Sequence, residues 1–126
     1  AAAYFMAIVV QRSEFERQKM LELLDAHYTC QADQMYTGQT ELPWEDLTLT
    51  LREAPGHSPG SQIIEIGKRW YFTGDSLIPG EEVITRLPGG NRKDYAEVTR
   101  PYLASIAPGS ILFPGHGPES VFEGEL

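Results

Sequence analysis

The stretch PGHSPG (residues 55–60) surrounds His57 with two prolines and two glycines, and the stretch PGHGP (residues 114–118) repeats the pattern around His116. The chain contains three histidines, and two of them occupy these nearly identical turns. Proline reduces the entropy that a turn loses on folding, and glycine lets the backbone approach a neighbouring group closely. The two turns therefore predict histidines with fixed positions, and the rest of the fold must support them.

Each histidine turn follows a segment that is typical of a strand. The segment LTLTL (residues 47–51) alternates at period two, which predicts a strand with its leucines facing a core and its threonines facing the other side. The segment SILF (residues 110–113) predicts a short buried strand before the second turn. Both histidines thus lie just beyond the end of a predicted strand.

The chain between the two turns predicts a hairpin followed by a helix. The runs SQIIEI (residues 61–66) and RWYFTG (residues 69–74) are separated by a Gly-Lys pair, which favours an antiparallel hairpin with a tight loop. A loop rich in glycine and proline (residues 79–91) precedes a helical stretch (residues 92–106). Within that stretch, Pro101 must either kink one helix or start a second.

A third polar side chain, Asp75, follows the second strand of that hairpin directly after Gly74. Imidazole and carboxylate groups are ligands that divalent metals such as zinc accept in proteins. Side chains at the ends of neighbouring strands are held by rigid elements and still project beyond them. The pattern therefore favours a metal site made of His57, Asp75 and His116, although each of them also fits an ordinary turn residue.

The first third of the chain says less about function. Residues 3–10 predict an interior strand and residues 13–26 an amphipathic helix, with short extended pieces expected in residues 28–44. His27, at the end of that helix, is expected to interact with the helix dipole rather than with a metal. Cys30 is expected to be a small buried side chain, because no second cysteine can join it in a disulfide or a thiolate metal site.

Composition limits the partners and the location of the protein. The length of 126 residues suits a single domain, and the formal net charge of −8 would repel a phosphate backbone, which argues against a nucleic-acid partner. No apolar run reaches the length of about 18 residues that a membrane span needs. The single cysteine favours a reducing, cytoplasmic setting.

Four motifs in this order resemble those of the C-terminal half of a metallo-β-lactamase-fold hydrolase, nearest to the glyoxalase II-like branch. They are APGHSPGS (residues 54–61), YFTGDSLI (residues 71–78), RLPGGN (residues 86–91) and ILFPGHGPES (residues 111–120). The resemblance implies an α/β (α+β) fold, namely the C-terminal half of a four-layer αββα sandwich with a mixed β-sheet and flanking helices. It also implies that residues 1–126 form a single, partial domain.

The same resemblance implies roles for the residues at the strand ends. In such proteins the histidine of the PGH turn ligates one metal ion, the aspartate of TGD bridges two ions and the histidine of PGHGP ligates the second, so these roles pass to His57, Asp75 and His116. The implied metal is zinc, with iron or manganese as alternatives, and the implied reaction is hydrolysis of a small-molecule ester or thioester by metal-activated water. Ser58 and Ser76 would either orient these ligands or bond the local backbone.

The H-x-H-x-D-H motif that supplies the family's other ligands is absent from the 126 residues. With His57, Asp75 and His116 alone, each metal position has two protein ligands, whereas a catalytic zinc usually has three and an open position. We therefore expect a truncated chain that binds metal weakly or not at all and is inactive alone. A half sandwich would also expose an apolar sheet face, which predicts a homodimer.

Three hypotheses stay open on the sequence. The chain is a piece of a metal-dependent hydrolase, or a naturally short, non-catalytic relative that serves as a binding or interaction module, or a protein with one metal site built at a dimer interface from two copies of the three residues. A nuclease branch of the same fold is disfavoured by the net charge of −8.

Overall fold

The computed structural model describes residues 32–126, so the predicted N-terminal strand and helix, His27 and Cys30 lie outside the described residues. The chain divides into two compact units, Ala1–Tyr36 and Thr37–Leu126, and every helix and strand described below belongs to the second. Because the two units are described separately, the expectation of a single domain stays a prediction.

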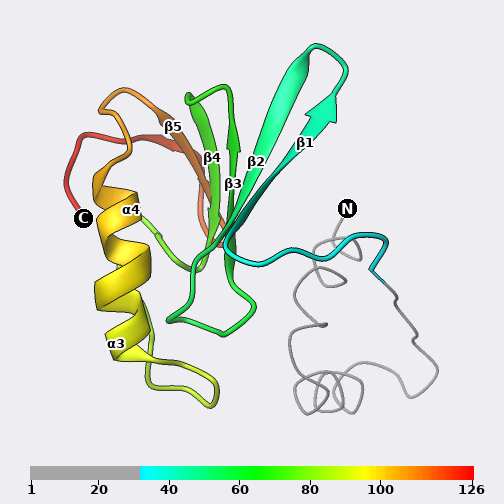
Figure 1. Ribbon diagram of the computed structural model, residues 1–126. Helices are drawn as coiled ribbons and strands as arrows, with labels where there is room; N and C mark the ends of the chain where they lie inside the picture. Colours follow the sequence, from blue (N-terminus) through cyan, green and yellow to red (C-terminus); the bar gives the residue numbers. More distant parts are fainter. Residues whose placement is uncertain (1–31) are drawn as a thin grey trace. The chain divides into compact units, whose positions relative to one another are not determined.

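Six strands form one mixed sheet whose spatial order follows their order in the sequence (Figure 1). They are β1 (Gln39–Trp44), β2 (Leu47–Glu53), β3 (Gln62–Ile66), β4 (Trp70–Gly74), β5 (Ile111–Pro114) and β6 (Ser120–Val121). Neighbouring strands pair antiparallel, except that β4 and β5 are parallel. Since β2 and β4 both run antiparallel to β3, the strands β2, β4 and β5 share one direction, and their carboxyl ends lie at one edge of the sheet.

The predicted hairpin is confirmed as β3 and β4. Gly67 and Lys68 at its turn have φ values of 60° and 54°, the left-handed backbone of a type I′ turn, and Arg69 completes a three-residue loop between the paired Ile66 and Trp70. The extended structure expected within residues 28–44 is confirmed for β1. This strand tolerates Pro43 because, among the strands of residues 32–126, it lies at the edge of the sheet, where one side of the backbone needs no ladder bonds.

The strand predicted at residues 47–51 is confirmed and extends to Glu53. Its leucines are unequally buried, since Leu51 is 6% exposed and Leu47 is 41% exposed. The reason is that β3 pairs with β2 only from Leu49 onward, so the start of β2 projects past its neighbour. All three leucines share one face of the strand, and the predicted burial is complete only at Leu51, which lies outside the main core cluster.

One helix connects β4 to β5, made of α3 (Arg92–Asp94), a π-helical turn (Tyr95–Thr99) and α4 (Arg100–Ala104). The Asn91 side chain caps it by accepting a hydrogen bond of 3.0 Å from the N–H of Asp94. Pro101 has no N–H, and in an α-helix its ring would collide with the carbonyl four residues earlier. The wider π turn directly before it accommodates the ring. The helix therefore continues through Pro101 instead of splitting in two.

The helix covers one face of the sheet and forms the core with it (Figure 1). The buried core residues are Ala54, Ile63, Tyr71, Leu77, Leu103, Ile106, Leu112 and Phe122. Ile63 and Leu103 are fully buried, and removing each such side chain from water contributes about 1.5–3 kcal/mol. Tyr102 adds a polar contact, because its hydroxyl donates to the Glu65 carboxylate at 3.2 Å while the Arg52 guanidinium lies over its ring.

The face of the sheet that points away from the helix is apolar. Residues that pair directly across strands share a face, and two rows of such pairs consist of large apolar side chains. The rows are Leu42, Leu49, Ile66, Trp70 and Ile111, and Leu51, Ile64, Phe72 and Phe113. The rings of Phe72 and Phe113 stack with a centroid distance of 4.8 Å. We call these two rows, together with Trp44 and Leu47, the apolar sheet face.

The mixed sheet with a helix on one face confirms the predicted α/β (α+β) class. Its one helical layer and one sheet layer correspond to part of the expected four-layer sandwich. Across residues 32–126, no helix has both the length and the apolar character that crossing a membrane requires.

We predict that stability falls at alkaline pH. Burial is the main cause that raises the pKa of Tyr71, Tyr95 and Tyr102 above the ordinary tyrosine value of about 10. A pKa that is higher in the folded state gives stability that is complete below about pH 10 and is lost as the pH rises toward the folded pKa, because the unfolded chain ionises first. Urea unfolding from about pH 8 to about pH 11 measures this loss.

The matched variant for this prediction is Tyr102→Phe. At neutral pH it should lose about 1 kcal/mol with the hydrogen bond to Glu65. Above about pH 10 its stability should fall less steeply than that of the parent chain, since one raised pKa is gone. Equal alkaline slopes for the two proteins would contradict the prediction.

Candidate metal centre

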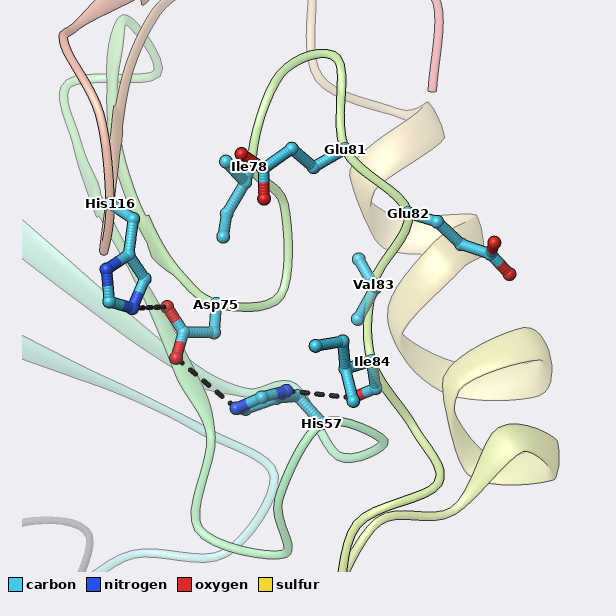
Figure 2. A pocket seen from close by; sticks show the side chains of 8 residues that line it. All are labelled: His57, Asp75, Ile78, Glu81, Glu82, Val83, Ile84 and His116. Atoms are coloured by element: carbon cyan, nitrogen blue, oxygen red, sulfur yellow. Dashed lines mark hydrogen bonds and ion pairs between the residues drawn. The ribbon is translucent and has the colours of Figure 1, made fainter.

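The three predicted ligands meet at the edge of the sheet where β2, β4 and β5 end. His57 lies in the turn after β2, Asp75 follows β4 directly, and His116 lies in the turn after β5 (Figure 2). The shared direction of these strands is the reason that residues so far apart in sequence come together. Their proximity is therefore observed, and their role as metal ligands stays a prediction.

The Asp75 carboxylate lies between the two imidazoles. Nε2 of His57 is 3.3 Å from Oδ2, and Nε2 of His116 is 3.3 Å from Oδ1. Each histidine thus faces a different oxygen of one carboxylate (Figure 2). A carboxylate that bridges two metal ions, each with one histidine, presents its oxygens in this way. A carboxylate paired with imidazolium groups makes the same contacts, so the geometry is compatible with both.

The second ring nitrogen of His57 has a partner of its own. Nδ1 lies 2.8 Å from the backbone oxygen of Ile84, and because a carbonyl can only accept, Nδ1 is the donor. In a neutral imidazole this leaves a lone pair on Nε2, directed at Asp75. Two electron-rich atoms that face each other need a proton or a metal cation between them. Metal-ligating histidines commonly have their other nitrogen fixed by such a hydrogen bond.

Glycines allow the close approach of these turns. A Cβ on Gly115 would collide with Oδ1 of Asp75, and the Gly115 N–H donates to the Gly74 carbonyl at 2.8 Å. Gly56 has a φ of 136°, and its missing Cβ leaves room for Tyr95. The glycine before each histidine is therefore required by the packing of the turn that carries it.

A cavity of about 180 Å³ opens beside these side chains, lined by His57, Asp75, Ile78, Glu81, Glu82, Val83, Ile84 and His116 (Figure 2). The side chain of His57 is 24% exposed, that of Asp75 33% and that of His116 73%, so the site opens to solvent mainly at His116. The sequence predicts residues 79–91 only as a loop and does not predict the wall that the first part of this loop forms. No periodicity marks such a wall, because its position depends on tertiary contacts.

The donor types suit zinc, iron or manganese, but the donors are few. Within the part of the chain that the structure describes, no group of three or more His, Cys, Asp or Glu side chains is arranged to hold a metal ion. His57 and His116 face different oxygens of the Asp75 carboxylate. Two metal positions at this carboxylate would each have two protein ligands.

The two serines beside these residues make different contacts. Oγ of Ser58 is 2.8 Å from Oγ of Ser61, which is the local contact of a turn serine. The buried Ser76 hydroxyl donates at 3.5 Å to the carbonyl of Ala54, a residue distant in sequence that directly follows β2, so its contact is not the local one that the sequence allows.

Comparison with known proteins identifies the fold. No protein-family model and no curated protein matches the chain. Among solved structures, the BLEG-1 B3 metallo-beta-lactamase is 25% identical, with a TM-score of 0.66 over 81% of this chain and 51% of that one. ETHE1 from Myxococcus xanthus is 21% identical, with a TM-score of 0.63 over 71% and 41%. TTHA1623, solved in a di-iron-bound form, is 25% identical, with a TM-score of 0.57 over 74% and 46%.

These similarities confirm the predicted resemblance at the level of the fold, because the chain has part of the metallo-β-lactamase fold. It spans about half, or less, of the length of the structures that it matches. A shared fold does not by itself carry over an activity, so function must be argued from the site.

The contact between Gly115 and Asp75 predicts an energetic coupling between the two positions. Gly115→Ala should destabilise the chain by about 1–3 kcal/mol, because its Cβ overpacks the carboxylate. In an Asp75→Ala background most of that cost should vanish, since the colliding oxygen is gone. Urea unfolding of the parent, both single variants and the double variant measures the coupling, and a value near zero would mean that Gly115 does not constrain Asp75.

Proposed function

We propose that this chain provides part of the active site of a metallo-β-lactamase-like, metal-dependent hydrolase, in which His57 and His116 each ligate one metal ion and Asp75 bridges the two. The observation that carries the proposal is the position of the two Nε2 atoms, each 3.3 Å from a different oxygen of one carboxylate. The hydrogen bond from His57 to Ile84 supports it, because it leaves Nε2 as the nitrogen with a free lone pair. Zinc is the proposed metal, with iron or manganese as alternatives.

The proposed reaction is hydrolysis of an ester or thioester of a small molecule, as in the glyoxalase II-like branch. A bound metal ion would supply an activated water and polarise the scissile carbonyl. The turns after the strands fix the relative positions of the two histidines and the carboxylate. The wall from Ile78 to Ile84 would cover the reacting end of the substrate. A cavity of about 180 Å³ suits an acyl group together with its ester or thioester bond. It is smaller than the pockets of about 300–1,000 Å³ that hold a whole drug-sized molecule.

We further infer that donors from outside residues 32–126 complete this site. Two protein ligands per metal are fewer than the three that a catalytic zinc usually has. The 126-residue chain is therefore expected to hydrolyse substrates poorly when it acts alone. A second copy of the chain is one source of the missing donors, and a single metal shared at a dimer interface is the corresponding alternative.

A second candidate function is that of a short, non-catalytic relative that serves as a binding or interaction module. The observation that favours it is the absence, among the described residues, of any group of three or more metal-ligating side chains. Metal binding by the chain separates the two candidates, because a pure interaction module has no need of a metal at His57.

The apolar sheet face supports a homodimer as the assembly. Trp44 is 58% exposed and Leu47 is 41% exposed, and both adjoin the two rows of large apolar side chains. A symmetric pair of such faces would bury Trp44 and Leu47, the two members of the face that are exposed. The single cysteine and the net charge of −8 fit a cytoplasmic protein that acts on a small molecule, with neither nucleic acid nor membrane as a partner.

Zinc titration tests the metal site. The 126-residue chain should bind zinc weakly but measurably in isothermal titration calorimetry, and His57→Ala and Asp75→Ala should each weaken binding at least tenfold, because each removes a ligand. His27→Ala is the matched control, since His27 is the remaining histidine and is not expected to ligate metal. If His57→Ala binds zinc like the parent, His57 is not a ligand and the hydrolase proposal fails, whereas a parent that binds no zinc favours the interaction module.

Sedimentation equilibrium tests the assembly. The chain should sediment as a dimer, and Trp44→Ser together with Leu47→Ser should shift it toward monomer, because the pair removes exposed apolar surface from the apolar sheet face. Leu87→Ser is the control, since Leu87 is also exposed, at 52%, but lies outside this face. A parent chain that stays monomeric at high concentration would contradict the dimer.

A further inference from the structure

The π-helical turn Tyr95–Thr99 contacts both turns that carry the proposed ligands. The Tyr95 hydroxyl donates to the backbone oxygen of Ser76 at 3.1 Å, directly after Asp75. The start of the same side chain packs against Gly56, where a Cβ would collide with it. One tyrosine therefore touches the residue after Asp75 and the residue before His57.

A second side chain of the same turn acts on the first histidine turn. The Thr99 hydroxyl donates to the Pro55 carbonyl at 2.6 Å, and Thr99 is 1% exposed. The N–H of Asn91, at the start of the helix, donates to the Gly56 carbonyl at 2.8 Å. The backbone oxygens of both residues that precede His57 are thus bonded to groups of the helix or its cap.

We propose that the π-helical turn is a positioning element for the metal centre, with Tyr95 and Thr99 as positioning residues that set the distance between His57 and Asp75. The inference rests on the proposed function. Both hydroxyls donate to backbone oxygens of the two turns, so both act through the backbone. Single π-helical turns within α-helices often occur at functional sites, and here the turn contains both residues at its first and last positions.

The next helical turn provides a contrast within the same helix. The Tyr102 hydroxyl also bonds across to the sheet, but its acceptor is the Glu65 side chain, and its ring lies under Arg52. Tyr102 therefore contributes to helix packing without touching either turn of the site. Removing one hydroxyl at a time separates positioning from packing.

Cobalt binding to the 126-residue chain tests this inference. We would measure the Co²⁺ dissociation constant and the visible absorption of bound Co²⁺ for the parent, Tyr95→Phe, Thr99→Val and Tyr102→Phe, together with the thermal unfolding midpoint of each. Tyr95→Phe and Thr99→Val should weaken Co²⁺ binding about tenfold and alter the absorption bands, the size of effect expected for groups that orient ligands. Tyr102→Phe should leave the Co²⁺ affinity and spectrum unchanged, even if its thermal unfolding midpoint drops as much as those of Tyr95→Phe and Thr99→Val.

The outcomes distinguish this inference from the proposed function. If the parent binds Co²⁺ and Tyr95→Phe binds it with the same affinity and spectrum, the positioning role is wrong and the metal site stands. If all three variants lose affinity in proportion to their loss of stability, the contacts are structural only and the inference is overturned. If the parent does not bind Co²⁺, the two turns do not form a metal centre in this chain and the inference is overturned, while the proposed function keeps its own test by zinc titration. Should Thr99→Val not fold, Thr99→Ser, which keeps the hydroxyl, must bind like the parent.

Discussion

The parallel pairing of β4 with β5 is the constraint on which the rest of this structure depends. Two parallel neighbours cannot be joined by a tight turn, so the chain between them must cross from one end of the sheet to the other. Here that crossing contains the loop that lines the cavity and the helix that covers the core. The same pairing brings the carboxyl ends of the two strands to one edge, which is why Asp75 and His116 meet.

The sequence predicts the parts of the site that local chemistry determines. Alternation in residues 47–51, a Gly-Lys pair between two apolar runs, and turns of proline and glycine each have a local physical cause, and the corresponding strands, hairpin and turns are observed. The place of His57, Asp75 and His116 after strands also follows from sequence, but their proximity requires β2, β4 and β5 to run in one direction, which depends on the pairing of the strands. The short strand β6 and the uneven burial of β2 were not predictable locally, since both depend on which neighbours are present.

The helix shows where local reasoning ends. Pro101 offered a choice between a kink and a second helix, and the structure resolves it with a wider turn that needs one more residue per bond. No pattern in the sequence marks Tyr95 or Thr99 as more than helix residues, because their acceptors are backbone oxygens on loops distant in the sequence. Contacts of this kind become visible only when the helix and the sheet edge are seen together.

The acidic side chains that line the cavity favour the approach of positively charged ions over negatively charged ones. Asp75, Glu81 and Glu82 line it together, and no lysine or arginine is among its lining residues within the described part of the chain. In a chain whose formal net charge is already −8, these carboxylates focus a negative potential at the mouth of the cavity. Cations are concentrated there, the proposed metal ions among them, and their own positive charge would then decide which substrates approach.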